Sequence, residues 1–151
     1  MDIKIRRAQS EEELKACAEL FTDNDPWKKI GETYEYNYDK VHSPGTEVYV
    51  AMDNDRVAGC LLLEMDSTLK AFVRGLVVSE EYRSKKIGSA LLKHIEERVF
   101  SETKNVFLFC SSERGHRFYK ANGYEEIGVI KDLNQPGMHE TIFRKTIGTL
   151  H

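Results

Sequence analysis

Three cations at the start of a predicted helix give the clearest chemical signal in this sequence. Residues 77–92 read VVSEEYRSKKIGSALL, which predicts an apolar strand, a short polar turn and a helix that opens on Arg83, Lys85 and Lys86. The N-terminus of a helix already has the positive end of the helix dipole, so cations there should destabilise it. The conflict disappears if a polyanion binds at that point, because free N–H groups, the dipole and the basic side chains would all face it. The pattern therefore favours a phosphorylated small molecule, with a diphosphate as the obvious candidate.

The elements that must position this turn predict one domain covering residues 1–151. Alternating or continuous apolar residues predict strands, and apolar residues at three- and four-residue steps predict helices. Strands are predicted over 2–7, 47–52, 57–65, 72–78, 106–110, 124–131 and 139–146, and helices over 10–21, 27–41, 83–99 and 113–122. The order β-α-α-β-β-β-α-β-α-β-β predicts an α/β (α+β) fold with a mixed, mostly antiparallel sheet flanked by helices.

The composition is that of an ordinary soluble globular protein. The chain has 151 residues, 31% of them charged, and a formal net charge of -3, which argues against nucleic-acid binding over a large surface. We expect no membrane segment, because no apolar run approaches the ~20 residues of a span, and the N-terminus lacks the apolar core of a signal peptide. Cys17, Cys60 and Cys110 lack metal-type spacing and fit a reducing compartment, so a cytoplasmic protein without a metal site is predicted.

Two short motifs, taken together, indicate the activity. The first runs from Arg83 to Ala90, RSKKIGSA, and the second from Phe118 to Tyr124, FYKANGY. They resemble the GNAT superfamily of acyl-CoA-dependent N-acetyltransferases, whose acyl-CoA motif is Arg/Gln-x-x-Gly-x-Gly/Ala and whose later motif is Phe-Tyr-x-x-x-Gly-Phe/Tyr. Both motifs occur here in that order, with an apolar strand between them. The resemblance covers the whole chain and implies a GNAT-like fold with acetyl-CoA (coenzyme A) as the acyl donor.

By this resemblance, the fourth predicted strand and the turn after it bind acetyl-CoA. The backbone of Leu76, Val77 and Val78 would pair with the pantetheine arm, and N–H groups of the turn would hold the pyrophosphate. The turn residues in this role are Arg83, Ser84, Lys85, Lys86, Ile87, Gly88 and Ser89. Ser112 lies where many members have an asparagine that contacts the cofactor, although a role as a helix N-cap is favoured for it.

Lys86 departs from the family motif, because the first glycine of the motif falls at this position. A glycine there permits close approach of the backbone to the pyrophosphate. Our hypothesis is that Lys86 has ordinary helical geometry and turns its ammonium group toward a phosphate of CoA. A solvated lysine at the start of a helix explains the residue equally well.

Tyr119 is the residue that the resemblance assigns to the chemical step. Attack of an amine on a thioester expels a thiolate, and a proton donor speeds that departure. The matching family tyrosine lies beside the thioester sulfur and acts as the general acid. The developing oxyanion would be bound by a main-chain N–H of the same strand, that of Val78. The alternative for Tyr119 is a purely structural core aromatic.

The sequence marks two features less clearly: the base that takes the proton of the amine, and the site that binds the amine. Many members have a carboxylate on the strand that here reads AFVRGL, which has none, so Glu64 on the preceding strand is the best candidate, acting through a water. An ordinary outward-facing strand residue is the simpler interpretation of Glu64. Arg74 could bind a carboxylate of the substrate or pair with Glu64. Asp25, Trp27 and Tyr34 could hold a cationic amine by charge and cation–π contact, although aromatic residues at helical spacing more often belong to a core.

The sequence therefore predicts an N-acetyltransferase that moves an acetyl group from acetyl-CoA to a primary amine by direct attack in a ternary complex. The alternative is a non-catalytic acyl-CoA-binding sensor or interaction domain on the same fold. The acceptor could be a small molecule or a protein amine, and a homodimer, as in many relatives, is compatible with this interpretation.

Overall fold

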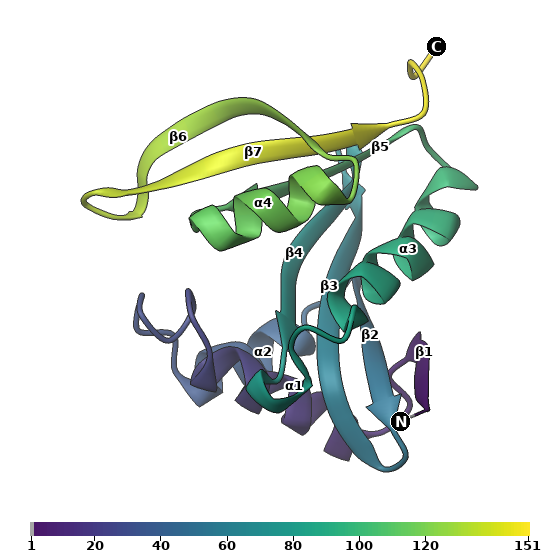
Figure 1. The fold of residues 1–151 in the computed structure, drawn as a ribbon, viewed down its shortest axis with the longest axis vertical. Helices are drawn as coiled ribbons and strands as arrows, with labels where there is room; N and C mark the ends of the chain where they lie inside the picture. Colours follow the sequence, from purple (N-terminus) through teal and green to yellow (C-terminus); the bar gives the residue numbers. More distant parts are fainter. Residues whose placement is uncertain (1) are drawn as a thin grey trace.

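The computed structural model describes residues 2–151 as a seven-stranded sheet with four α-helices (Figure 1). The strands are β1 (Ile3–Arg7), β2 (Thr46–Asp53), β3 (Arg56–Ser67), β4 (Lys70–Val78), β5 (Asn105–Cys110), β6 (Glu125–Gln135) and β7 (Met138–Thr146). The helices are α1 (Glu11–Asp23), α2 (Tyr34–Val41), α3 (Ile87–Phe100) and α4 (Glu113–Ala121), with a short 3-10 helix at Glu80–Tyr82. In the part of the chain described, no helix is both long enough and apolar enough to cross a membrane.

The strand order in the sheet is β1-β2-β3-β4-β5-β7-β6. Every neighbouring pair is antiparallel except β4 and β5, which are parallel. The predicted α/β fold and its mixed, mostly antiparallel sheet are therefore confirmed, and the helices and strands occur in the predicted order.

Two helices begin later than the sequence predicts. The second predicted helix is reduced to α2, which begins at Tyr34 because the Thr33 hydroxyl caps it by accepting a hydrogen bond from the N–H of Tyr36 at 3.1 Å. The third helix begins at Ile87, so the prediction that it opens on Arg83 is wrong. Arg83 to Lys86 lie in the turn before the helix, and their charges therefore do not occupy its first turn.

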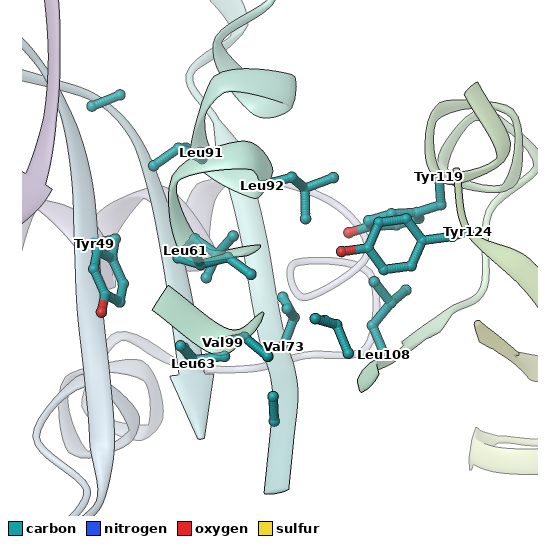
Figure 2. Packing of buried hydrophobic residues seen from close by; sticks show 14 of the residues in the cluster. Tyr49, Leu61, Leu63, Val73, Leu91, Leu92, Val99, Leu108, Tyr119 and Tyr124 are labelled. Atoms are coloured by element: carbon teal, nitrogen blue, oxygen red, sulfur yellow. The ribbon is translucent and has the colours of Figure 1, made fainter. Parts of the chain in front are cut away.

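The helices cover both faces of the sheet and bury two apolar clusters. Cys17, Phe21 and Val41 of α1 and α2 pack on one face, together with Leu62 and Val77 of the sheet. The other face packs against α3 and α4, and Figure 2 shows residues of this second cluster, with Leu91, Leu92 and Val99 of α3 over the strands and the rings of Tyr119 and Tyr124 side by side.

A β-bulge at Arg74 changes which side chains of β4 face each cluster. Leu62 lies opposite Gly75 and Leu63 lies opposite Val73, which leaves Arg74 as the extra residue. Before the bulge, Val73 packs in the cluster under α3. After it, Gly75 faces α1, because a Cβ on Gly75 would lie 2.7 Å from Cε1 of Phe21. The bulge therefore places the side chain of Arg74 on the face of the sheet covered by α1 and α2, near Ser43 after α2.

Candidate active site

One cavity of about 680 Å³ lies where β4 and β5 separate. The two strands pair only from Ala71 to Val73 on β4 and from Val106 to Leu108 on β5, after which β5 continues its pairing with β7. Beyond Val73, no strand within residues 2–151 pairs with β4 on that side. The cavity walls come from β4, the turn before α3, the start of α4, the β6–β7 hairpin and the segment between α1 and α2. The hairpin tip reaches that segment, since Gln135 Nε2 donates to the carbonyl of Lys29 at 3.4 Å.

Leu76 and Val78 turn their backbone polar groups toward this open edge. The N–H of Ser79 donates to the carbonyl of Ala58 at 2.8 Å, while Val78 lies opposite Gly59. In an antiparallel ladder this register makes Val78 a non-hydrogen-bonded pair, so its N–H and C=O point away from β3, as do those of Leu76 two residues earlier. An edge of this kind can pair with an extended ligand as an added strand would.

The turn before α3 offers a set of free N–H groups to the same cavity. The first backbone bond of the helix runs from Ala90 N–H to the Lys86 carbonyl at 3.1 Å, so the N–H groups of Ile87, Gly88 and Ser89 have no acceptor within the helix. Lys86 has no side-chain capping bond. The cavity is lined by Ser84, Lys86, Ile87, Gly88 and Ser89, whereas Lys85 is exposed and outside the lining. The predicted turn therefore has the donors that an anion needs.

The hypothesis that Lys86 has ordinary helical geometry is wrong. Its backbone is left-handed, with φ 63° and ψ 20°, and Ser84 is also left-handed, with φ 64°. Successive N–H groups around such residues converge and form an anion-binding concavity. Lys86 thus has the backbone geometry that a glycine adopts without strain, although it carries a side chain.

The guanidinium of Arg83 bonds within the protein. Nη2 donates to Asn24 Oδ1 at 2.7 Å, and Nε donates to the carbonyl of Val78 at 3.3 Å. Arg83 lines the cavity, but these bonds tie the end of β4 to the residue that follows α1. Its side chain is therefore better placed to fix the turn than to meet a phosphate.

Replacing Lys86 by Gly is expected to raise the free energy of unfolding by about 0.5–1 kcal/mol, because the left-handed backbone strains any residue with a Cβ. Urea denaturation would measure the change. Lys86→Ala is the matched control, because it removes the ammonium group but keeps the strain. Equal stability of the Gly and Ala variants would contradict the assignment of strain to this position.

Gly88 and Ser112 fix how α3 and α4 meet at the cavity. A Cβ on Gly88 would lie 3.0 Å from Cζ of Phe118, so only glycine permits this approach of the two helices without a shift. The Ser112 hydroxyl caps α4 by accepting a hydrogen bond from the N–H of Gly115 at 3.0 Å. The favoured interpretation of Ser112 as an N-cap is confirmed, and Ser112 also lines the cavity.

Tyr119 lies on α4 at the wall of the cavity and is only 9% exposed. Its ring contacts those of Phe118, Tyr124 and Phe143, with centroids 5.1, 5.7 and 5.8 Å apart. Burial raises the pKa of the Tyr119 hydroxyl well above its usual value, and the neighbouring Cys110 adds to this effect. The hydroxyl makes no hydrogen bond to any residue between 2 and 151. It is therefore a protonated donor with its hydrogen free.

The predicted acceptor residues divide into two groups. Asp25, Trp27, Glu64 and Arg74, which were candidates for the acceptor site, line the cavity. Tyr34 does not. Its ring packs with the α1–α2 cluster and lies 6.1 Å from that of Tyr38, whereas Tyr36, two residues on, faces the cavity. Arg74 forms no ion pair with Glu64, and among residues 2–151 its one hydrogen bond goes to the hydroxyl of Ser43 at 3.5 Å.

Four further charged residues of the cavity escaped the sequence analysis, and one of them is Arg114 at the start of α4. Lys40 is 4% exposed, and its Nζ lies 2.9 Å from Oε1 of Glu32, which also lines the cavity. Glu140 on β7 is 7% exposed. The sequence of β7, MHETIFRKT, has no regular alternation of charged and apolar residues that would mark Glu140, and its burial depends on the β6–β7 hairpin.

Comparison with known proteins settles the family. The family model described as "Acetyltransferase (GNAT) family" matches residues 12–124 of the chain. The chain belongs to the GNAT acetyltransferase family. The GNAT assignment rests on a match that includes the open edge of β4, the turn before α3 and the FYKANGY motif of α4.

Individual GNAT proteins are similar to this chain. An uncharacterized N-acetyltransferase of Chlorobaculum tepidum is 32% identical over 81 residues, which are 54% of this chain and 51% of that protein, so the match spans about half of the relative's length. A GNAT-family structure from Desulfovibrio desulfuricans has a TM-score of 0.86 at 16% identity, covering 97% of this chain and 100% of the other. A GNAT acetyltransferase of Elizabethkingia anophelis with acetyl-CoA bound has a TM-score of 0.74 at 17% identity, covering 96% and 98%. These structures confirm the GNAT fold.

Proposed function

We propose that this GNAT protein is an N-acetyltransferase that transfers an acetyl group from acetyl-CoA to a primary amine in a ternary complex, in the cytoplasm. The observation that carries the proposal is the open edge of β4 in line with the free N–H groups of Ile87, Gly88 and Ser89. The open edge of β4 suits an extended chain with amide groups, and the free N–H groups suit a diphosphate. A single ligand with both parts in that order is acetyl-CoA, which supplies the acetyl thioester.

The residues for binding acetyl-CoA follow from this arrangement. Leu76, Val77 and Val78 are proposed to bind the pantetheine arm through the backbone, and the turn from Arg83 to Ser89 to bind the pyrophosphate. The side chains of Lys85 and Lys86 are exposed and add positive charge to this turn. A fixed set of N–H groups costs little reorganisation when an anion binds, which favours pre-organised recognition.

The chain's own residues account for the two proton movements of the reaction. Tyr119 holds its proton, since burial raises the pKa of the hydroxyl, and can donate it to a departing thiolate. The N–H of Val78 is directed away from β3 and can donate to an oxyanion. The amine must lose a proton to a carboxylate of the cavity, for which Glu64 is the candidate from the sequence. Asp25, Trp27 and Arg74 are proposed to bind the acceptor.

The experiment that tests this proposal is amine-dependent release of thiol from acetyl-CoA by the purified protein, with mass spectrometry of the amine. Equal amounts of thiol and N-acetylated amine are expected. Thiol release that does not depend on the amine would indicate hydrolysis. Binding of acetyl-CoA without transfer to any amine would favour the alternative, a sensor domain on the same fold.

A further inference from the structure

Several charged side chains of the cavity form no ion pair within residues 2–151. Two of them, of opposite charge, are Arg74 on β4 and Glu140 on β7. Both lie on the face of the sheet covered by α1 and α2. The β4 bulge places Arg74 there, and Glu140 faces away from Phe143, which packs under α4. This is the face on which Asp25 and Trp27 also line the cavity, so we call this part of the cavity the acceptor side.

Arg74 adds a positive charge to the acceptor side that the fold does not neutralise. Within residues 2–151 its one hydrogen bond is the 3.5 Å contact with the neutral hydroxyl of Ser43. The other cation of this region, Lys40, is already matched by Glu32 at 2.9 Å. Burial lowers the pKa of Lys40, Glu32 opposes that shift, and the charge of Arg74 lowers the pKa further. A guanidinium that is half-buried beside a second cation is stabilised by an anion, and its planar donors suit a carboxylate or a phosphate.

Glu140 is a buried carboxylate with one oxygen left without a donor. Oε1 accepts a hydrogen bond from Nδ2 of Asn134 at 3.1 Å. Oε2 is fully buried and accepts none from residues 2–151. Burial raises the pKa of the Glu140 carboxyl above its usual value, against the effect of nearby His116. Leaving such a group without a donor costs stability, so a cationic donor in the cavity is the natural partner.

We propose that the acceptor is an amine that also carries an anionic group, with its ammonium bound at Glu140 and its anion bound at Arg74. The proposal rests on the proposed acetyl transfer and narrows its substrate class. Arg74 and Glu140 belong to different walls of the cavity, β4 and the β6–β7 hairpin, so the acceptor lies across the space between them.

The test compares pairs of amines that differ in the anionic group. L-phenylalanine is paired with phenethylamine, and O-phosphoethanolamine with ethanolamine, in the thiol-release assay. The wild type is expected to show a kcat/KM at least about 10-fold higher for the anionic member of a pair, the size of one charged hydrogen bond. The pair that shows the preference identifies carboxylate or phosphate as the anion.

Three variants assign the two charges. Arg74→Gln is expected to lower kcat/KM about 10- to 100-fold for the preferred anionic amine and to change it less than about threefold for its neutral partner. Glu140→Gln is expected to raise KM for both members alike, without changing the Kd of acetyl-CoA. Glu126→Gln is the matched control, because Glu126 lies on the outer strand β6, is not part of the cavity lining and pairs with surface Lys120 at 2.9 Å.

Equal use of both members of each pair by the wild type would overturn this inference and leave the acetyl transfer standing. If Arg74→Gln lowers kcat/KM equally for both amines of a pair, the assignment of Arg74 would be overturned. If Glu140→Gln leaves KM unchanged, the assignment of Glu140 would be overturned. If none of the four amines supports thiol release, the result would count against the acetyl transfer itself as well as against this inference.

Discussion

Replacing Tyr119 by Phe is expected to lower turnover about 100-fold, the lower end of the range for loss of a general acid. The change removes one oxygen from a residue that is 9% exposed and keeps its ring among Phe118, Tyr124 and Phe143. Because the Tyr119 hydroxyl has no hydrogen-bond partner within residues 2–151, little stability should be lost. The affinity for acetyl-CoA, measured by calorimetry, is expected to stay within about twofold.

Tyr124→Phe is the matched control for this prediction. The Tyr124 hydroxyl donates to Oε2 of Glu96 at 2.8 Å and is buried, so its loss leaves a buried carboxylate oxygen with one donor fewer. We expect a loss of about 1–3 kcal/mol in the free energy of unfolding and no comparable loss of turnover. If Tyr119→Phe keeps full turnover, Tyr119 has no role as the proton donor.

Replacing Glu32 by Gln is expected to lower the free energy of unfolding by about 3–5 kcal/mol, the cost of breaking a buried ion pair from one side. Lys40 is 4% exposed, with Nζ 2.9 Å from Glu32 and 4.5 Å from the ring centre of Phe21. Without Glu32 the ammonium keeps the ring of Phe21 and the repulsive charge of Arg74 as neighbours, and within residues 2–151 Lys40 has no second ion pair to replace Glu32. Urea denaturation of the variant would measure the loss.

The pH dependence of the stability loss in Glu32→Gln distinguishes the loss of an ion pair from the loss of packing contacts. Burial lowers the pKa of Lys40 below its value of 10.5 in the unfolded chain, and Glu32→Gln should lower it further. Between the lowered value and 10.5 the unfolded chain binds more protons than the folded one, so stability rises with pH. The deficit of Glu32→Gln should therefore shrink as the pH approaches 10.5. A loss below ~1 kcal/mol, or one independent of pH in that window, would contradict a buried charged pair.

The fold was predictable because its local signals agree with one another. Ser10 and Glu13 mark the start of α1, and the apolar repeat of Leu91, Ile95 and Val99 marks the buried face of α3. The second helix was placed too early because Trp27 and Ile30 continue the apolar spacing of α2. Those residues lie in turns between α1 and α2, where they pack or line the cavity without helical hydrogen bonding to α2.

The site was predictable where it depends on motif and backbone, and unpredictable where it depends on tertiary packing. The turn before α3 and Tyr119 follow from short motifs. The left-handed backbone of Lys86 is imposed by the turn against the preference of the residue, so local rules point the wrong way. The bulge at Arg74 and the unpaired oxygen of Glu140 arise from pairing between distant strands, which the order of residues does not reveal.

The most direct test of the central claim, that the open edge of β4 and the turn before α3 bind acetyl-CoA, is a calorimetric titration of the protein with acetyl-CoA, using NADH as the diphosphate control. The account predicts saturable one-to-one binding of acetyl-CoA that weakens as salt is added, and no comparable binding of NADH. Absence of binding at millimolar acetyl-CoA, or equal binding of NADH, would contradict it.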